Sequence, residues 1–336
     1  MNMKEWMSEI IRNPKRIAIP IMTSPGIEHI KKTVKSAVTD GTVHFEAICA
    51  LNELYPSAAC CVIMDLTVEA EAFGASVIFP KDEIPTVSGR LVYDLPSVKE
   101  LKVPDISAAR VPQYLLANKL AAGHINDKPV FGGCIGPFSL AGRLYDLSEL
   151  MMACYCEPEI AETLLSKCGE FLLHYCLALK NQGVQGVIIA EPAAGLLSDE
   201  QCKEFSSQYI KPIVDAVQDD SFMIVLHNCG NKGHCTDAML YTGSMAYHFG
   251  NMIDMHVALE QCPSDVLVMG NLDPTTLFRN GTDQEMKAAT KDLLEKTASY
   301  PNFVLSSGCD VPPHTPYANI SAFYSALEEY NVSLRL

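Results

Sequence analysis

Eight short apolar, β-branched runs recur along the chain, separated by longer segments of helical character. Apolar runs of this length, bounded by turn residues, are typical of strands buried on both faces. The eight runs span residues 16–23, 58–66, 128–133, 186–191, 222–227, 245–249, 266–270 and 302–307. Eight strands joined by helical crossovers favour a (β/α)8 TIM barrel of the α/β class over an open sheet.

The segments between several of these runs have the pattern of crossover helices. We predict helices over residues 158–182, 198–218 and 283–299, the first two opening at an acidic or capping residue. The part through about residue 125 is less regular, and its proline-rich stretch 80–112 predicts an N-terminal extension with a hairpin and an added helical layer near the barrel mouth. No linker-like stretch interrupts the pattern, so we expect a single domain over residues 1–336.

Composition excludes several classes of protein. A chain of 336 residues with 48% hydrophobic content can bury one large core. Its net charge of −15, without a basic block, argues against nucleic acid as a partner. The apolar stretches fall short of the length that crosses a bilayer. Thirteen cysteines in a long chain without an apolar signal segment are expected to be reduced thiols of a cytoplasmic protein. The oligomeric state stays open.

Two of the predicted strands end in soft metal ligands. Because side chains alternate along a strand, His227 and Cys229 project from the same face, about 6–7 Å apart along the backbone. A third ligand from Cys309, which follows a distant strand, would leave one position of a zinc tetrahedron for water or substrate. The alternative is a buried thiol and a histidine bonded to a backbone carbonyl, and spacing alone does not decide between them.

A rival cluster lies in the same loop. His227, Cys229, His234 and Cys235 fall within nine residues and have the ligand types of a closed four-ligand site. A closed site would have no open coordination position and would leave Cys309 without a role. We therefore rank it below the three-ligand site.

Three acidic residues follow predicted strands, where barrel enzymes keep their sites. Glu191 is a candidate catalytic residue, either as a fourth, displaceable zinc ligand or as the base that takes a proton from an incoming thiol. Asp65 is a second catalytic candidate, and Asp273 is a candidate for cofactor contact. Each has an alternative interpretation as a helix cap, a loop anchor or a partner in a salt bridge.

A glycine-rich turn follows the run at residues 128–133. It reads Gly-Gly-Cys-Ile-Gly-Pro over residues 132–137 and matches neither phosphate-binding loop pattern. Gly133 and Gly136 are therefore candidate cofactor-binding positions where the backbone approaches a large flat ligand. The competing interpretation is a tight turn at the barrel rim.

Five phrases in the chain carry a resemblance to a known family. They are EAEAFG (residues 69–74), EPAAG (191–195), HNCG (227–230), MGNLDP (269–274) and SGCDVPP (307–313). In this order they resemble the uroporphyrinogen decarboxylase superfamily, and more closely its corrinoid-dependent branch of the methylcobamide:coenzyme M methyltransferase type. The resemblance extends from about Arg16 to Leu327. By position it implies that His227, Cys229 and Cys309 are zinc ligands.

The resemblance also implies a reaction. Such an enzyme would move a methyl group from a methylated corrinoid, carried by a partner corrinoid protein, to a thiol such as coenzyme M. A different thiol or a reduced folate could serve as the acceptor, and the sequence does not separate these. Zinc suits the task because it holds a bound thiol as the nucleophilic thiolate.

Two other functions stay open. The first is decarboxylation of a tetrapyrrole, for which Asp65 stands where the decarboxylase aspartate would be. Against it, the stretch after Arg16 through residue 26 has no arginine to hold substrate carboxylates. The second is a corrinoid-protein docking partner without catalysis, which a closed zinc site would indicate. The glutamate at position 191, where the family phrase has aspartate, and the extra pair His234 and Cys235 are departures that bear on this choice.

Overall fold

The computed structural model describes residues 1–334 and contains one large parallel sheet. Its strands are β1 Cys60–Cys61, β4 Val130–Ile135, β5 Gly186–Ala190, β6 Met223–Asn228, β7 Ala246–Phe249, β8 Leu267–Leu272 and β9 Phe303–Ser307, in the spatial order β1-β4-β5-β6-β7-β8-β9. Each lies within or overlaps one of the predicted runs. The α/β class and the parallel sheet are therefore confirmed.

The remaining predicted run, residues 16–23, which is the first of the eight in the sequence, forms two isolated parallel bridges rather than a regular strand. Ile19 N–H donates to the Leu305 carbonyl of β9 at 2.9 Å, and the Ala18 carbonyl accepts from Ala58 N–H at 2.9 Å. The segment thus lies between β9 and the approach to β1. Pro20 has no N–H to offer on the β1 side, and β1 is only two residues long, so a regular ladder does not form there.

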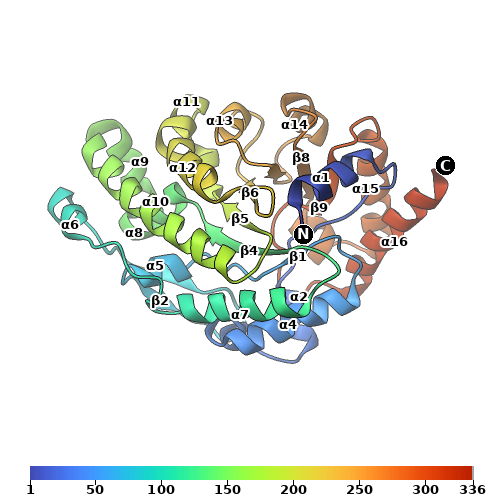
Figure 1. Ribbon diagram of the computed structural model, residues 1–336, viewed down its shortest axis with the longest axis horizontal. Helices are drawn as coiled ribbons and strands as arrows, with labels where there is room; N and C mark the ends of the chain where they lie inside the picture. Colours follow the sequence, from blue (N-terminus) through green and yellow to red (C-terminus); the bar gives the residue numbers. More distant parts are fainter. Residues whose placement is uncertain (335–336) are drawn as a thin grey trace.

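Helices form an outer layer around the strands, with α4 and α7 on the side of β1 and β4 (Figure 1). The α-helices are α1 Met3–Arg12, α2 Ser24–His29, α3 Val34–Thr39, α4 Gly41–Leu54, α5 Val68–Ala72, α6 Leu95–Glu100, α7 Val111–His124, α8 Pro137–Tyr145, α9 Leu147–Cys156, α10 Pro158–Asn181, α11 Asp199–Cys202, α12 Gln208–Val217, α13 Thr236–Tyr241, α14 Met255–Gln261, α15 Asp283–Lys296 and α16 Tyr317–Ser333. Short 3-10 or π turns occupy Pro192–Leu196, Lys203–Ser207 and Pro274–Arg279. Within the described residues, no helix is both long and apolar enough to cross a membrane.

The predicted helices are present with small differences. The helix predicted over residues 158–182 is α10, which ends at Asn181. The helix predicted over residues 283–299 is α15, which ends at Lys296 and opens with a capping box between Thr282 and Glu285. Residues 198–218 are split into α11, a π turn and α12. The predicted hairpin is formed by β2 Ser76–Ile78 and β3 Thr86–Ser88, which pair antiparallel. It begins a few residues before the proline-rich stretch, because prolines cannot donate to the ladder.

One apolar cluster fills the inside of the sheet. Its members alternate along the strands and include Ile19, Cys61, Phe131, Ile188, Val225, Ala246, Met269 and Val304. Met3 of α1 is fully buried in the same cluster, and Trp6 packs edge-on to Phe131 with ring centroids 6.0 Å apart. Because Met3 N–H also donates to the Asp220 carbonyl just before β6, at 2.6 Å, α1 closes the amino-terminal end of the strands. The carboxyl ends, where polar side chains gather, lie at the opposite edge.

Candidate metal centre

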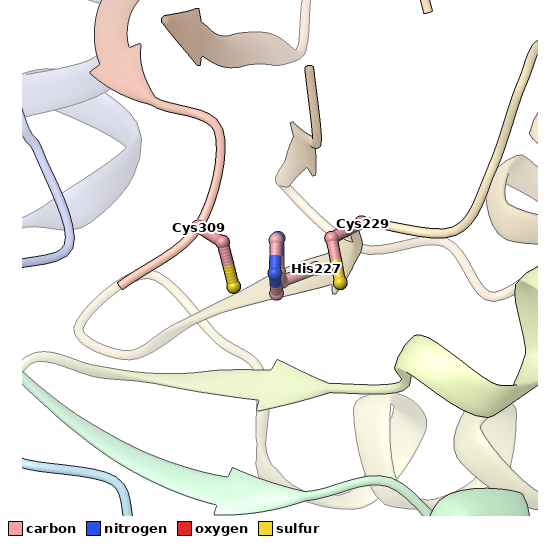
Figure 2. Close-up of side chains that lie close together, drawn as sticks. All are labelled: His227, Cys229 and Cys309. Carbon is pink, nitrogen blue, oxygen red and sulfur yellow. The ribbon is translucent and has the colours of Figure 1, made fainter. Parts of the chain in front are cut away.

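Three soft ligand side chains meet at the carboxyl ends of β6 and β9. His227 is the penultimate residue of β6, Cys229 directly follows that strand, and Cys309 comes two residues after β9. The ligand atoms of the three side chains lie within 4.8 Å of one another (Figure 2). On a tetrahedral zinc ion such atoms would be about 3.5–3.8 Å apart, given metal bonds of about 2.0–2.3 Å. Small side-chain movements would therefore close the three ligands around one ion.

The turn after β6 positions Cys229. The Asn228 side-chain oxygen accepts from the N–H groups of Gly230 and Asn231, each at 3.0 Å, which fixes the bend just past the cysteine. Gly250, directly after β7, leaves the space that the cysteine backbone occupies. A Cβ at residue 250 would lie 2.6 Å from the Cys229 Cα. Sequence reasoning missed this glycine, although its place directly after a predicted strand was a signal for close backbone approach.

The two thiols influence each other's ionisation. A hydrogen bond with Cys309 lowers the pKa of Cys229 from its ordinary value. The same bond, together with burial, raises the pKa of Cys309 to about 12. Cys229 is therefore the easier of the two thiols to deprotonate. Metal binding would use this form, because thiolates are the form of cysteine that binds metals.

His227 supplies the third candidate ligand atom. Its ring is 2% exposed, and its Nε2 is a buried polar atom without a hydrogen-bond partner among residues 1–334. Buried ring nitrogens are nearly always bonded, so an orphaned one beside two thiols fits a metal ligand. Its Nδ1 lies 2.7 Å from Nδ1 of His248 on β7. Burial and the neighbouring His227 hold the pKa of His248 well below its usual range.

The rival loop cluster does not form. His234 is exposed, whereas Cys235 is buried with its sulfur 3.4 Å from the Leu197 carbonyl. Across residues 1–334, the only group of three or more His, Cys, Asp or Glu side chains close enough to hold a metal ion is His227, Cys229 and Cys309. The loop therefore turns its second cysteine into the core and its second histidine to solvent.

Glu191 lies apart from this group. Its carboxylate accepts from the backbone N–H groups of Phe138 at 2.9 Å and Ser139 at 2.7 Å, in the first turn of α8. The Ser206 hydroxyl donates to it at 3.2 Å. These bonds satisfy the free donors at the helix start and engage the side chain away from the thiols. The structure thus gives Glu191 the helix-capping contacts of its alternative interpretation.

Asp65 is engaged in a buried ion pair. Its carboxylate accepts from the Arg110 guanidinium, from the Tyr114 hydroxyl at 2.9 Å and from Thr67, whose N–H lies at 2.8 Å. The Phe79 ring covers the guanidinium, with its centroid 4.7 Å from the Arg110 Cζ. The residue after β2 thus covers this ion pair, and the Asp65 oxygens face protein donors.

The candidate cofactor positions have protein neighbours as well. A Cβ at Gly133 would lie 2.0 Å from the Met64 Cγ, and one at Gly136 would lie 2.4 Å from a Glu191 carboxylate oxygen. Asp273 caps the turn Pro274–Arg279 by accepting from Thr275 and Thr276 N–H, both at 2.8 Å. The glycines thus make room for side chains of this chain, as in a tight turn at the rim.

Glu69 of α5 is a buried acid that gives a pH-dependent prediction. One of its oxygens accepts from Ile135 N–H at 3.0 Å, and the other has no partner in the described part of the chain. Burial raises its pKa from 4.5 to about 7. Because the folded state holds this proton more tightly than the unfolded state, its contribution to stability is full below about pH 4.5 and is lost as pH rises through about 7.

We expect Glu69→Gln to remove this loss. Through this group the wild type should lose roughly 2–4 kcal/mol of its free energy of unfolding between pH 5 and pH 8, at about 1.4 kcal/mol per unit of pKa shift. The variant should not show this loss. Urea titrations of both proteins at the two pH values measure the difference. Parallel pH profiles for the two proteins would contradict a raised pKa at Glu69.

The fold and site together define the chain as an α/β protein with a thiol-rich candidate metal centre at the carboxyl ends of its strands. The family model described as uroporphyrinogen decarboxylase (URO-D) matches residues 14–330. The chain therefore belongs to the uroporphyrinogen decarboxylase family, whose members are enzymes, and the resemblance seen in the sequence is confirmed.

Relatives come from both branches of the family. The methylcobamide:CoM methyltransferases MtbA of Methanosarcina acetivorans and Methanosarcina mazei are each 29% identical over 273 residues, which cover 80% of this chain and 79% of theirs. The uroporphyrinogen decarboxylase of Alcanivorax borkumensis is 26% identical over 287 residues, 82% of this chain and 80% of its own. A solved methyltransferase from Methanosarcina mazei has the same fold, with a TM-score of 0.88, 22% identity and coverage of 98% of this chain and 99% of its own.

Proposed function

We propose that this protein is a zinc-dependent methyltransferase that moves a methyl group from a methylated corrinoid to a thiol. The observation that carries the proposal is the group of one imidazole nitrogen and two sulfurs within 4.8 Å at the strand ends. Three protein ligands leave one position of a zinc tetrahedron open, as in catalytic zinc sites. The similarity to the MtbA methyltransferases supports the same class of donor and acceptor.

The orphaned Nε2 of His227 and the neighbouring thiols of Cys229 and Cys309 suit a cation with a preference for nitrogen and sulfur. A bound zinc ion would hold an incoming thiol as thiolate, the nucleophilic form. The protein's part is to hold the three ligands on one side of the ion, so that the open coordination position faces the barrel mouth and an incoming methyl donor.

We also infer that residues 16–23 take the eighth place in a closed barrel, because they bond to both Leu305 and Ala58.

The proposed reaction balances without a further reactant. A sulfur–carbon bond forms and the carbon–cobalt bond breaks, with its electron pair left on cobalt, which goes from cobalt(III) to cobalt(I). The thiol proton is released. The corrinoid is the methyl donor, and we propose that a separate corrinoid protein carries it and docks at the barrel mouth. The acceptor is coenzyme M, another small thiol or a reduced folate.

Tetrapyrrole decarboxylation has less support from the site. The Asp65 carboxylate that would face a substrate is bonded to Arg110, Tyr114 and Thr67. The segment after Arg16 offers no arginine for substrate carboxylates. These contacts favour a structural role for Asp65.

Two measurements on the untagged protein test the proposal. Plasma mass spectrometry should find about one zinc per chain. Incubation with methylcobalamin and coenzyme M, other thiols or a reduced folate should then give loss of the methylcobalamin spectrum and a methylated acceptor by mass spectrometry. A protein that takes up no zinc when zinc is supplied would favour the cofactor-free decarboxylase or a docking role. A zinc-loaded protein that demethylates no donor would favour the docking role alone.

A further inference from the structure

A chain of buried hydrogen bonds runs from His227 to the backbone of the first segment. His227 Nδ1 lies 2.7 Å from His248 Nδ1, and His248 Nε2 lies 2.8 Å from the Ser306 hydroxyl of β9. The Ser306 hydroxyl donates to the Ile19 carbonyl at 2.7 Å. All three side chains are at most 2% exposed. This series of hydrogen bonds therefore links β6, β7, β9 and residues 16–23 beneath the two cysteines.

The serine sets the direction of this chain. A hydroxyl has one hydrogen, and the carbonyl of Ile19 can only accept, so the Ser306 hydrogen points to that carbonyl. In its contact with His248 Nε2 the hydroxyl must then accept, and Nε2 must carry the hydrogen.

The positions of the hydrogens on the two histidine rings follow from that assignment. His248 is fully buried, and none of its hydrogen-bond partners in residues 1–334 is acidic, so its ring is neutral with a lone pair on Nδ1. Two lone pairs would repel at 2.7 Å, so His227 Nδ1 must carry a hydrogen and donate it. The remaining nitrogen of His227, Nε2, is left with an unpartnered lone pair, free for an ion held together with Cys229 and Cys309.

We propose that His248 is a positioning residue that fixes the tautomer and ring orientation of His227, so that the Nε2 lone pair is directed at the metal site before an ion binds. The inference rests on the proposed metal centre and deepens it. Partners of this kind, one bond behind a metal ligand, typically change metal affinity by about 10–100-fold. Here the partner is an imidazole whose own tautomer is set by Ser306 and the Ile19 carbonyl.

A second acceptor lies near His227 Nδ1, the backbone carbonyl of His248 at 3.3 Å. It stays in place in every variant of residue 248, and its distance is longer than that of the ring contact. Differences between variants of residue 248 therefore report on the ring.

The first experiment reads the tautomers of the wild-type protein directly. In the metal-free protein with 15N-labelled histidine, long-range proton–nitrogen spectra report the tautomer of each of the nine histidines. We expect His227 with its hydrogen on Nδ1 and His248 with its hydrogen on Nε2, the two assigned by single His→Gln substitutions. A hydrogen on Nε2 of His227 would overturn the inference.

The second experiment compares two substitutions of the full chain. His248→Asn places its side-chain oxygen where Nδ1 was and keeps an acceptor for His227, whereas His248→Phe removes it. Chelator competition should give a zinc affinity about 10–100-fold lower for His248→Phe and close to the wild type for His248→Asn. The thiolate absorption bands of the cobalt(II)-substituted protein should change only in His248→Phe.

The outcomes separate this inference from the proposed function. Equal zinc affinity and equal cobalt spectra in a folded His248→Phe protein would overturn the positioning role and leave methyl transfer unaffected. Weakened zinc binding in the same variant, together with no methyl transfer by the wild type, would support the positioning role and reject the function. If His248→Phe does not fold, the tautomers of the wild type still decide whether His248 positions His227.

Discussion

Cys309→Ala should abolish methyl transfer and release zinc while leaving the fold intact. Cys309 is one of three candidate ligand side chains and lies in the bend after β9, half-buried at the edge of the sheet. Loss of a direct ligand should weaken zinc binding by more than the roughly 100-fold upper range for loss of a residue behind a ligand. Zinc per chain by plasma mass spectrometry, and the rate of methylcobalamin demethylation with thiol, measure the two effects.

Two other cysteines provide controls for this variant. Cys156, exposed on α9, is far from the ligand group in the sequence, and Cys156→Ala should keep full zinc and activity. Cys235→Ala should also keep its zinc, because the sulfur of Cys235 bonds to backbone carbonyls rather than facing Cys229. Full zinc in Cys309→Ala would remove that cysteine from the ligand set, and loss of zinc in Cys235→Ala would restore the loop cluster.

The strands were predictable because each is a continuous apolar run buried on both faces. Such runs can be recognised from their length and their flanking turn residues alone, without tertiary information. Residues 16–23 show the limit of this reasoning. The run is apolar and lies where an eighth strand would lie, but Pro20 removes one donor, and Ile21 N–H bonds to the Ser307 hydroxyl instead of a ladder carbonyl.

The ligand group was predictable in part from alternation. The period of two places His227 and Cys229 on one face, and the family resemblance adds Cys309 from about eighty residues away. The same alternation could have found His248, two residues after the inward Ala246. It could also have placed Glu191 on the outer face, since Ile188 points inward and residue 191 is three positions further on.

The partners of the acids were not predictable from local pattern. Glu191 finds its donors in α8, about fifty residues earlier, and Asp65 finds Arg110 in the segment before α7. Nothing in the sequence around either carboxylate specifies which distant donor reaches it. Contacts of this kind depend on how helices pack on the sheet, which periodicity does not encode.

The ion pair of Asp65 and Arg110 is expected to be the most costly polar contact to break. The two side chains are 2% and 8% exposed, and the guanidinium also donates to Glu71, to Thr67 and to the Val38 carbonyl. Removal of one partner from such a pair leaves a buried charge without compensation. Arg110→Met, which keeps much of the side-chain length, should therefore lower the free energy of unfolding by about 3–5 kcal/mol.

Urea titration measures this loss, and two further variants show its cause. Arg90→Met breaks an ion pair with Glu149 whose side chains are 37% and 43% exposed, so it should cost less than about 1 kcal/mol. In the double variant Asp65→Asn with Arg110→Met the Asp65 charge is no longer left unpaired and only the half-buried Glu71 loses its partner, so this variant should be more stable than Arg110→Met alone. A double variant as unstable as the sum of its single substitutions would show that the guanidinium acts through packing on Phe79 rather than through the charge of Asp65.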